Sequence, residues 1–187
     1  MTVDCIAIGT SLGGMDALRR LLTSLPATLK VPLVVVIHRA SVQHDYLLEV
    51  LQKHTPLKVQ EAQDRLAVTP GTITIAPADY HLLVDSGRFV LSLDAPLKFA
   101  RPSIDALLES VADEYAENAL GILLTGGGED GLKGLQAIKN AGGIVLVENP
   151  QTAFEPGLPA AAIGAGIVSD GLTLEEISHF LAKFAEP

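Results

Sequence analysis

The segment VDCIAIGTSLGG, residues 3–14, joins a short apolar run to a glycine-rich turn. A second apolar run, LVVVI, covers residues 33–37, and a helical pattern over residues 15–25 lies between the two runs. Nearly continuous apolar runs of this length are typical of parallel strands that are buried on both faces of a sheet. The chain therefore opens with a predicted βαβ unit.

The rest of the chain extends this unit into an α/β fold. We predict further helices over residues 45–53, 103–115, 131–141, 159–163 and 173–184, and strands over residues 57–62, 72–76, 119–125, 144–147 and 166–168. Residues 81–84 and 88–93, joined by the turn sequence Asp85-Ser86-Gly87, predict an antiparallel hairpin outside the main sheet. The expected fold is a three-layer, doubly wound, mostly parallel sheet of Rossmann-like type with that hairpin inserted, in one domain over residues 1–187.

Composition excludes several classes of protein. Of the 187 residues, 48% are hydrophobic and 19% are charged, which suits a packed core and argues against disorder. The formal charge of −9 disfavours a nucleic-acid partner, because such binding depends on Lys and Arg. No apolar run reaches the roughly 18 residues of a membrane span, and no basic flank suggests a signal peptide, so we expect a cytoplasmic protein without membrane insertion. Cys5, the single cysteine, excludes an internal disulfide and is expected to be a small buried hydrophobe.

Ser11 is the candidate nucleophile. The sequence GTSLG, residues 9–13, matches the G-x-S-x-G pattern, with a predicted strand before it and a predicted helix after it. This context would hold the serine hydroxyl on a sharp turn, beside helix N–H groups that could stabilise an oxyanion. The same residues also fit a plain glycine-rich turn whose serine caps the helix.

His38 and Asp130 are the candidate partners of Ser11. Each directly follows a predicted buried strand or its glycine-rich extension, at the carboxyl edge where α/β sheets bind ligands. A histidine there could take the serine proton, and a carboxylate could fix its tautomer. Glu129 competes for the carboxylate role, and Asp130 could instead be a helix N-cap. The remaining histidines, which we expect to be surface or capping residues and not zinc ligands, are His44, His54, His81 and His179.

A dinucleotide site is a competing interpretation of the same region. GGGEDG, residues 126–131, fits G-x-G-x-x-G after a strand, and Glu148 ends the next strand at about the expected spacing. However, Glu129 and Asp130 would place negative charges beside a pyrophosphate, and little chain follows Glu148. The order Ser, His, Asp along the chain also differs from the order in α/β-hydrolases.

Several ordered motifs resemble one family over essentially the whole chain. They are IGTSLGG (8–14), VVIH (35–38), APADYHLLV (76–84), RPSID (101–105), GILLTGGGEDG (121–131) and GLPAAAI (157–163). Together they resemble the catalytic domain of the CheB family, the chemotaxis receptor protein-glutamate methylesterases. The resemblance places the family's catalytic serine, histidine and aspartate on Ser11, His38 and Asp130.

The resemblance also implies a substrate and a reaction. The family hydrolyses methyl esters of glutamate side chains on the cytoplasmic helices of chemoreceptors, and deamidation of receptor glutamines is a related activity. We therefore expect a methylated chemoreceptor, or a related methylated protein, as partner, and expect no metal or organic cofactor. The alternative is a weakly catalytic or non-catalytic regulatory module that binds a partner through the same cleft.

Three departures from the family pattern bear on these expectations. Leu12 replaces the usual Thr after the nucleophile, and Gly127 replaces the Met of the Thr-Gly-Met-Gly stretch. Both changes would lie near the reacting ester, so substrate choice or rate could differ. Family members often carry a receiver domain before the catalytic domain, and no such sequence is present here. The chain is then either free-standing, with a regulatory partner in place of the receiver domain, or a piece of a longer protein.

Overall fold

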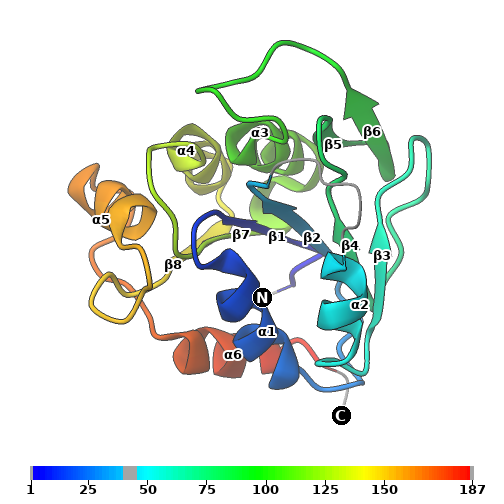
Figure 1. Ribbon diagram of the computed structural model, residues 1–187, viewed down its shortest axis with the longest axis horizontal. Helices are drawn as coiled ribbons and strands as arrows, with labels where there is room; N and C mark the ends of the chain where they lie inside the picture. The colour runs from blue at the N-terminus through cyan, green and yellow to red at the C-terminus, as the bar shows by residue number, and fades with distance from the viewer. Residues whose placement is uncertain (1, 40–45, 186–187) are drawn as a thin grey trace.

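The structure is a computed structural model that describes residues 2–39 and 46–185. Within these residues, six strands form one sheet in the order β3-β4-β2-β1-β7-β8 (Figure 1). The strands are β1 (Cys5–Thr10), β2 (Leu33–Ile37), β3 (Lys58–Glu61), β4 (Thr72–Ile75), β7 (Ala119–Leu123) and β8 (Ile144–Val147). Every pairing in this sheet is parallel, so the carboxyl ends of the strands lie along one edge.

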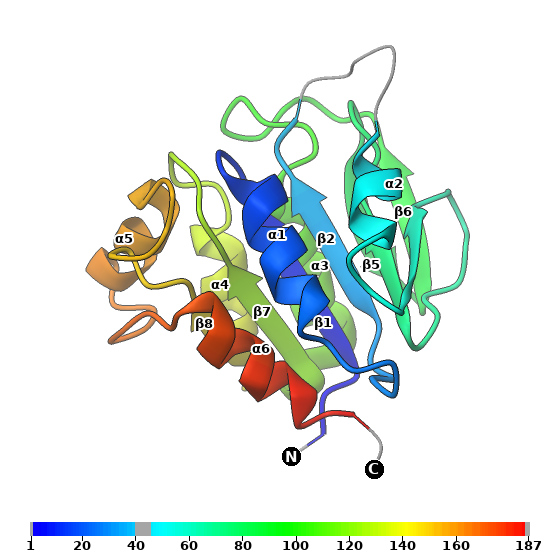
Figure 2. The ribbon, with the colours of Figure 1, turned by 60° about the horizontal axis from the view of Figure 1, so that its bottom comes forward.

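Helices cover both faces of the sheet. α1 (Gly14–Thr23), α2 (Leu47–Gln52) and α6 (Leu174–Ala182) pack on one face, and α3 (Ile104–Tyr115), α4 (Leu132–Asn140) and α5 (Gly157–Gly164) contribute to the core on the other. Figure 2 shows α1 and α6 in front of the sheet, with α3 and α4 behind it. A 3₁₀ turn, Ala116–Asn118, connects α3 to β7. The predicted three-layer, mostly parallel arrangement is confirmed.

Alternating side chains of the central strands supply two separate cores. In β1, Ile6 and Ile8 point into the core that contains α1 and α6, whereas Cys5 and Ala7 point into the core that contains α3. All four side chains are fully buried. Because both faces of the strand are covered, the sequence must be apolar at consecutive positions, and this is the pattern that predicted the strand.

The predicted hairpin lies outside the main sheet, as expected. β5 (His81–Asp85) and β6 (Arg88–Ser92) pair antiparallel as a separate two-stranded sheet. Phe89 is fully buried among residues of the α3 side of the core, and the backbone N–H of Val84 donates to Ser110 Oγ of α3 at 3.0 Å. The hairpin is therefore anchored on α3, and the segment 93–103 connects its second strand to that helix.

Residues 166–168 do not form a strand, so that prediction is wrong. The backbone N–H of Ile167 closes the end of α5, and its carbonyl accepts a hydrogen bond from Lys139 Nζ at 2.6 Å. These backbone groups are therefore used by a helix end and a side chain, so they cannot form a ladder. Beyond β8, Leu172 instead makes an isolated parallel bridge with Glu148.

Other predicted elements differ only at their ends. The helix predicted over residues 45–53 spans Leu47–Gln52, and Asp45 lies outside the described residues. The predicted start of α6 is confirmed, because Thr173 and Glu176 form a reciprocal capping box. No helix within the described part of the chain is long and apolar enough to cross a membrane.

The buried thiol of Cys5 gives a first prediction. Cys5 is fully buried in β1, and burial, followed by the charge of Asp4, raises the pKa of its thiol well above the usual range. Because the thiolate is the reactive form, we expect no reaction of native protein with a thiol reagent at pH 8. Unfolding in guanidinium should release one reactive thiol per chain. Rapid labelling of the native protein would contradict the burial of β1.

Candidate active site

The candidate site lies where the chain changes direction across the sheet. From β1 the chain builds β2, β4 and β3 on one side, and it then returns to place β7 and β8 on the other side. Open α/β sheets bind ligands at such a switch point, just outside the carboxyl ends of the strands. The residues that follow β1, β2 and β7 therefore share one rim.

Ser11 and His38 occupy equivalent positions on neighbouring strands. Thr10 is paired with Ile37 in the register of β1 and β2, so Ser11 and His38 each lie one residue beyond that pair. The backbone N–H of His38 donates to Thr10 O at 3.0 Å, and that of Ser11 donates to Thr125 O at 3.0 Å. Because neighbouring strands lie about 4.8 Å apart, the two side chains start within one strand spacing of each other.

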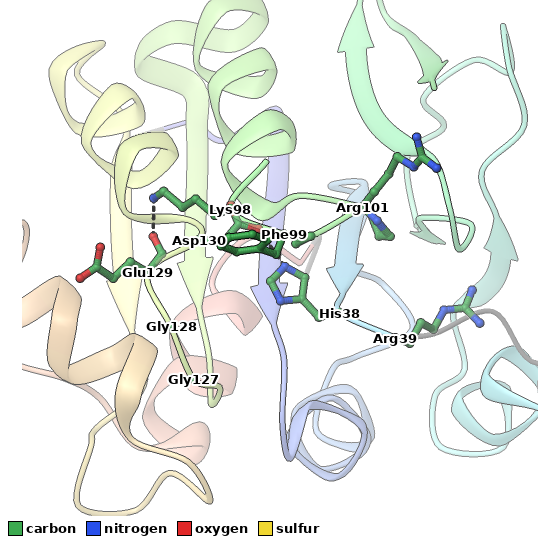
Figure 3. Close-up of a pocket in the computed structure, with 11 residues that line it drawn as sticks. His38, Arg39, Lys98, Phe99, Arg101, Gly127, Gly128, Glu129 and Asp130 are labelled. Atoms are coloured by element: carbon green, nitrogen blue, oxygen red, sulfur yellow. Dashed lines mark hydrogen bonds and ion pairs between the residues drawn. The ribbon is translucent and has the colours of Figure 1, made fainter. Parts of the chain in front are cut away.

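His38 is directly bonded to Asp130. His38 Nε2 lies 2.8 Å from Asp130 Oδ2, and Figure 3 shows the ring turned toward this carboxylate. An ionised carboxylate only accepts hydrogen bonds, so Nε2 carries the proton and Nδ1 is the nitrogen left as an acceptor. Among the described residues, neither His38 Nδ1 nor the Ser11 hydroxyl has a hydrogen-bond partner. The contact expected between Ser11 and His38 is thus not formed in this structure; such contacts often tighten only when substrate binds.

Asp130 takes the carboxylate position, and its competitor does not. The Glu129 side chain is exposed and points away from His38 in Figure 3. Asp130 is 4% exposed, and besides His38 it accepts hydrogen bonds from Ser103 Oγ at 2.8 Å, Ile104 N at 2.7 Å and Asp105 N at 3.0 Å. Asp130 also caps a helix, as the alternative interpretation proposed. The helix is α3, however, and not α4, which follows Asp130 in the chain.

These hydrogen bonds set the charge state of Asp130. Burial alone would raise the pKa of the carboxyl, but the bonds from His38, the backbone N–H groups of Asp105 and Ile104, and the Ser103 hydroxyl together lower it below its ordinary value. The carboxylate is therefore ionised at neutral pH. It can hold an imidazole in one tautomer and stabilise the imidazolium that forms during proton transfer.

The lowered pKa predicts an acid-dependent loss of stability. Stabilisation by Asp130 should be complete above the unfolded-state pKa of about 3.9 and should disappear as the pH falls through the lower folded-state pKa. Urea unfolding of the wild type and of Asp130→Asn should therefore give curves of stability against pH that converge in acid and separate toward neutral pH. A constant difference between pH 3 and pH 7 would contradict the assigned charge.

Thr125 holds the backbone around Ser11 in place through hydrogen bonds. Its carbonyl accepts hydrogen bonds from the Ser11 N–H at 3.0 Å and from Thr10 Oγ1 at 2.8 Å. Its hydroxyl lies 3.0 Å from the carbonyl of Leu12, to which it can donate. Its own N–H donates to the carboxylate of Glu148 at 2.7 Å. The turn that carries the serine is therefore tied to the end of β7 at three points.

The dinucleotide interpretation does not survive this geometry. Glu148 is 2% exposed and bonded to Thr125, so it does not face a ribose. The N–H groups of Gly131 and Gly134, which open α4 and would face a pyrophosphate, already donate to Asp105 Oδ1 at 2.8 and 3.0 Å. A carboxylate therefore occupies the position that a phosphate would need.

For Glu148 we predict a pH dependence of folding stability opposite to that for Asp130. Burial raises the pKa of its carboxyl, against the lowering effects of the Thr125 N–H and the Arg20 guanidinium. Its stabilising contribution is therefore largest in acid and is lost as the pH rises through the folded-state pKa. Glu148→Gln keeps an acceptor for Thr125 and removes the buried charge. The variant should be more stable than wild type at pH 7 to 8 and equal to it near pH 4; lower stability at pH 7 would contradict this.

A cavity of about 390 Å³ opens beside His38 and Asp130. Lys98, Phe99 and Ala100, from the turn of residues 97–100, form one wall, and Gly127 and Gly128 form another. Within the turn, Lys98 has φ 47 and Phe99 has φ 66, which is the geometry of a tight hairpin turn normally built with glycine or asparagine. Non-glycine residues in this region cost on the order of 1–3 kcal/mol each, so the surroundings must hold the turn in place.

Backbone donors are available on the same rim. The N–H groups of Leu12, Gly127 and Gly128 have no hydrogen-bond partner among residues 2–39 and 46–185. Donors of this kind can stabilise the charge that develops on a carbonyl oxygen under attack. Across the same described residues, no group of three or more His, Cys, Asp or Glu side chains is arranged to hold a metal ion.

Some residues near the site were not identified from the sequence. His81, predicted to be a surface or capping residue, is 3% exposed: its Nδ1 accepts from the Ser103 N–H at 3.2 Å, and Nε2 lies 3.2 Å from Ala95 O. The positions of Lys98 and Asp105 were also missed. His54 and His179 lie near the end of α2 and on α6, away from the rim, and His44 lies outside the described residues. The motif RPSID contained the only indication, since it places a carboxylate in the first turn of α3.

Comparison with known proteins assigns this arrangement to a family. A family model described as CheB methylesterase matches residues 6–181. The chain belongs to the CheB methylesterase family. Its fold agrees with the crystal structure of the Thermotoga maritima CheB methylesterase catalytic domain, with a TM-score of 0.92 and 31% identity over 99% of this chain and 100% of that one. The family resemblance and the fold expected from the sequence are thus confirmed.

Relatives in the family differ in how much of their length the chain covers. A Leptospira interrogans protein described as a protein-glutamate methylesterase/protein-glutamine glutaminase is 34% identical, over 98% of this chain and 95% of the relative. Proteins of the same description from Moorella thermoacetica and Azospirillum brasilense are 39% and 37% identical, but the chain spans only 43% and 48% of their length. The domain therefore occurs in the family both nearly alone and as part of a longer chain.

Proposed function

We propose that the protein is a serine-type methylesterase that removes methyl groups from glutamate side chains of chemoreceptors, with residues 1–187 acting as one catalytic domain. Ser11 is the nucleophile, His38 the general base and Asp130 the carboxylate that orients it. The 2.8 Å contact between His38 Nε2 and Asp130 Oδ2, on the rim one strand away from Ser11, is the observation that carries this proposal. Membership of the CheB family supports the reaction class.

The proposed reaction is acyl transfer in two steps. His38 Nδ1 accepts the Ser11 proton while Ser11 Oγ attacks the ester carbonyl, and the N–H groups of Leu12 and Gly127 face the resulting oxyanion. Methanol leaves with the proton from His38. A water molecule, deprotonated by the same nitrogen, then attacks the acyl carbon; the bond from that carbon to Ser11 Oγ breaks, Oγ takes the proton back from His38, and the glutamate side chain is released.

The surroundings of Ser11 suit a protein substrate. Leu12 is 59% exposed and Phe154 is 76% exposed, and Phe99 is fully exposed on the cavity wall. Phe154 lies against the turn that carries the serine, since a Cβ added at Gly13 would be 2.7 Å from its Cβ. We call Leu12, Phe99 and Phe154 the apolar rim. Exposed apolar groups around a catalytic rim are typical of a surface that binds another macromolecule.

The departures at Leu12 and Gly127 bear on substrate choice. A Cβ added at Gly127 would meet no atom closer than Glu155 Cγ at 3.8 Å, so packing does not require glycine there. A longer side chain would therefore fit at position 127. Because relatives of this chain are described as glutaminases as well as methylesterases, we include deamidation of glutamine in the proposal. Because the proposed substrates are side chains on the cytoplasmic helices of chemoreceptors, the proposal includes a cytoplasmic location for the protein.

Replacement of the nucleophile is the direct test. Purified Ser11→Ala protein should release methanol from a methylated receptor at least roughly 10⁴-fold more slowly than wild type, because no covalent intermediate can form. Ser169→Ala, at an exposed serine in the loop after α5, is the matched control and should retain full activity. Methanol release by Ser11→Ala at the wild-type rate would refute the mechanism. A wild-type protein that binds the receptor but releases no methanol would instead support a regulatory module.

A further inference from the structure

Asp105 is a buried carboxylate that the proposed reaction does not use. It lies in the first turn of α3 and is 3% exposed. Its Oδ1 accepts hydrogen bonds from the N–H groups of Gly131 at 2.8 Å and Gly134 at 3.0 Å, which open α4. The N-cap residue of α4 is Gly131, which has no side chain to do this. Asp105 therefore caps α4 from the neighbouring helix.

Asp130 caps α3 in the same way from the α4 side. Its carboxylate accepts from the N–H groups of Ile104 and Asp105, which open α3. The two helices thus exchange carboxylates, each satisfying the positive N-terminus of the other. Close contact makes the exchange geometrically feasible, because a Cβ added at Gly134 would overlap Leu108 and lie 3.0 Å from Asp105 O.

Lys98 links this exchange to the chain beside Asp130. Its Nζ lies 2.9 Å from Asp105 Oδ2 and donates to the backbone carbonyl of Glu129 at 2.7 Å, the dashed contact in Figure 3. Glu129 immediately precedes Asp130. One ammonium group therefore holds both the carboxylate that caps α4 and the peptide that leads into Asp130, and it does so from a turn with left-handed backbone.

We propose that Lys98 and Asp105 are positioning residues that set the angle of Asp130 toward His38. Without their side chains, residues 129–131 would lose two hydrogen bonds, from Lys98 Nζ to Glu129 O and from the Gly131 N–H to Asp105 Oδ1, and the backbone that carries Asp130 could shift relative to His38 Nε2. Neither residue is assigned contact with reacting atoms. The inference rests on the proposed function for its kinetic consequence, but the geometry that it describes can be measured without turnover.

The kinetic test uses two matched lysine variants. Lys98→Met keeps the length and apolar stem of the side chain and removes both Nζ contacts, whereas Lys133→Met makes the same change at an exposed lysine of α4. We expect kcat for methanol release to fall roughly 10- to 100-fold in Lys98→Met, because small displacements of a catalytic group cost this much. KM should stay within about twofold of wild type. Lys133→Met should match wild type in both constants.

Two variants of Asp105 separate the loss of its link to Lys98 from the loss of its cap on α4. Asp105→Asn keeps an oxygen acceptor for the N–H groups of Gly131 and Gly134 but weakens the link to Lys98, so it should lose less activity than Asp105→Ala, which loses both. Asp113→Asn, at an exposed carboxylate later in α3, is the control and should behave as wild type. If Asp105→Ala does not fold, Lys98→Met and Asp105→Asn still decide the question.

Proton NMR supplies a readout that does not depend on substrate. The proton held between His38 Nε2 and Asp130 Oδ2 should give a far-downfield resonance in wild type, Lys133→Met and Asp113→Asn. We expect it to be shifted or lost in folded Lys98→Met. If wild type lacks esterase activity but this resonance still responds to Lys98→Met, the proposed function fails and the positioning role stands.

Two results would overturn the positioning role. The first is a Lys98→Met protein whose kcat and downfield proton both match wild type. The second is a Lys98→Met protein that raises KM and leaves kcat and the proton unchanged, because Lys98 would then contact substrate directly from the cavity wall. In either case, normal methanol release by wild type would leave the proposed esterase reaction intact.

Discussion

The parallel pairing of β1 with β2 on one side and β7 on the other is the constraint on which the site depends. It brings the ends of three strands to one edge and fixes Ser11 and His38 at equivalent positions beyond paired residues. A slip of one residue would turn every side chain of β1 to the opposite face, so the two buried cores that enforce the strand register also enforce the position of the serine. The hydrophobic cores and the rim are therefore specified by the same alternation of side chains.

The second determinant is the exchange of carboxylates between α3 and α4. Asp130 serves the fold and the proposed reaction at once, since it satisfies the N-terminus of α3 and holds His38. A carboxylate with several fixed donors stays ionised and cannot easily rotate, which is what a residue that orients an imidazole requires. The cost is that the site and the helix packing cannot be changed independently. By contrast, Ser11 is tied only through its backbone, so its hydroxyl stays available.

Sequence reasoning found the parts of the site that local patterns encode. Ser11, His38 and Asp130 each follow an apolar run or its glycine-rich extension, and the carboxyl-edge rule then predicts that they share one rim. The sequence does not predict the roles of Lys98 and Asp105, because their contacts depend on how closely α3 and α4 pack and on a left-handed turn that contains no glycine. The strand expected near residue 167 failed for a similar reason, since a distant lysine takes its carbonyl. Contacts between segments far apart in the chain leave little trace in local periodicity.

The apolar rim has a consequence for how the domain can diverge. Leu12, Phe99 and Phe154 project from turns into solvent, and no strand or helix core depends on their side chains. Substitution of such residues changes folding stability little, whereas substitution of the buried carboxylates would remove hydrogen bonds at the N-termini of both α3 and α4. Partner recognition can therefore drift under selection while the reaction chemistry stays fixed. The same scaffold can in this way acquire a different binding surface without first losing its fold.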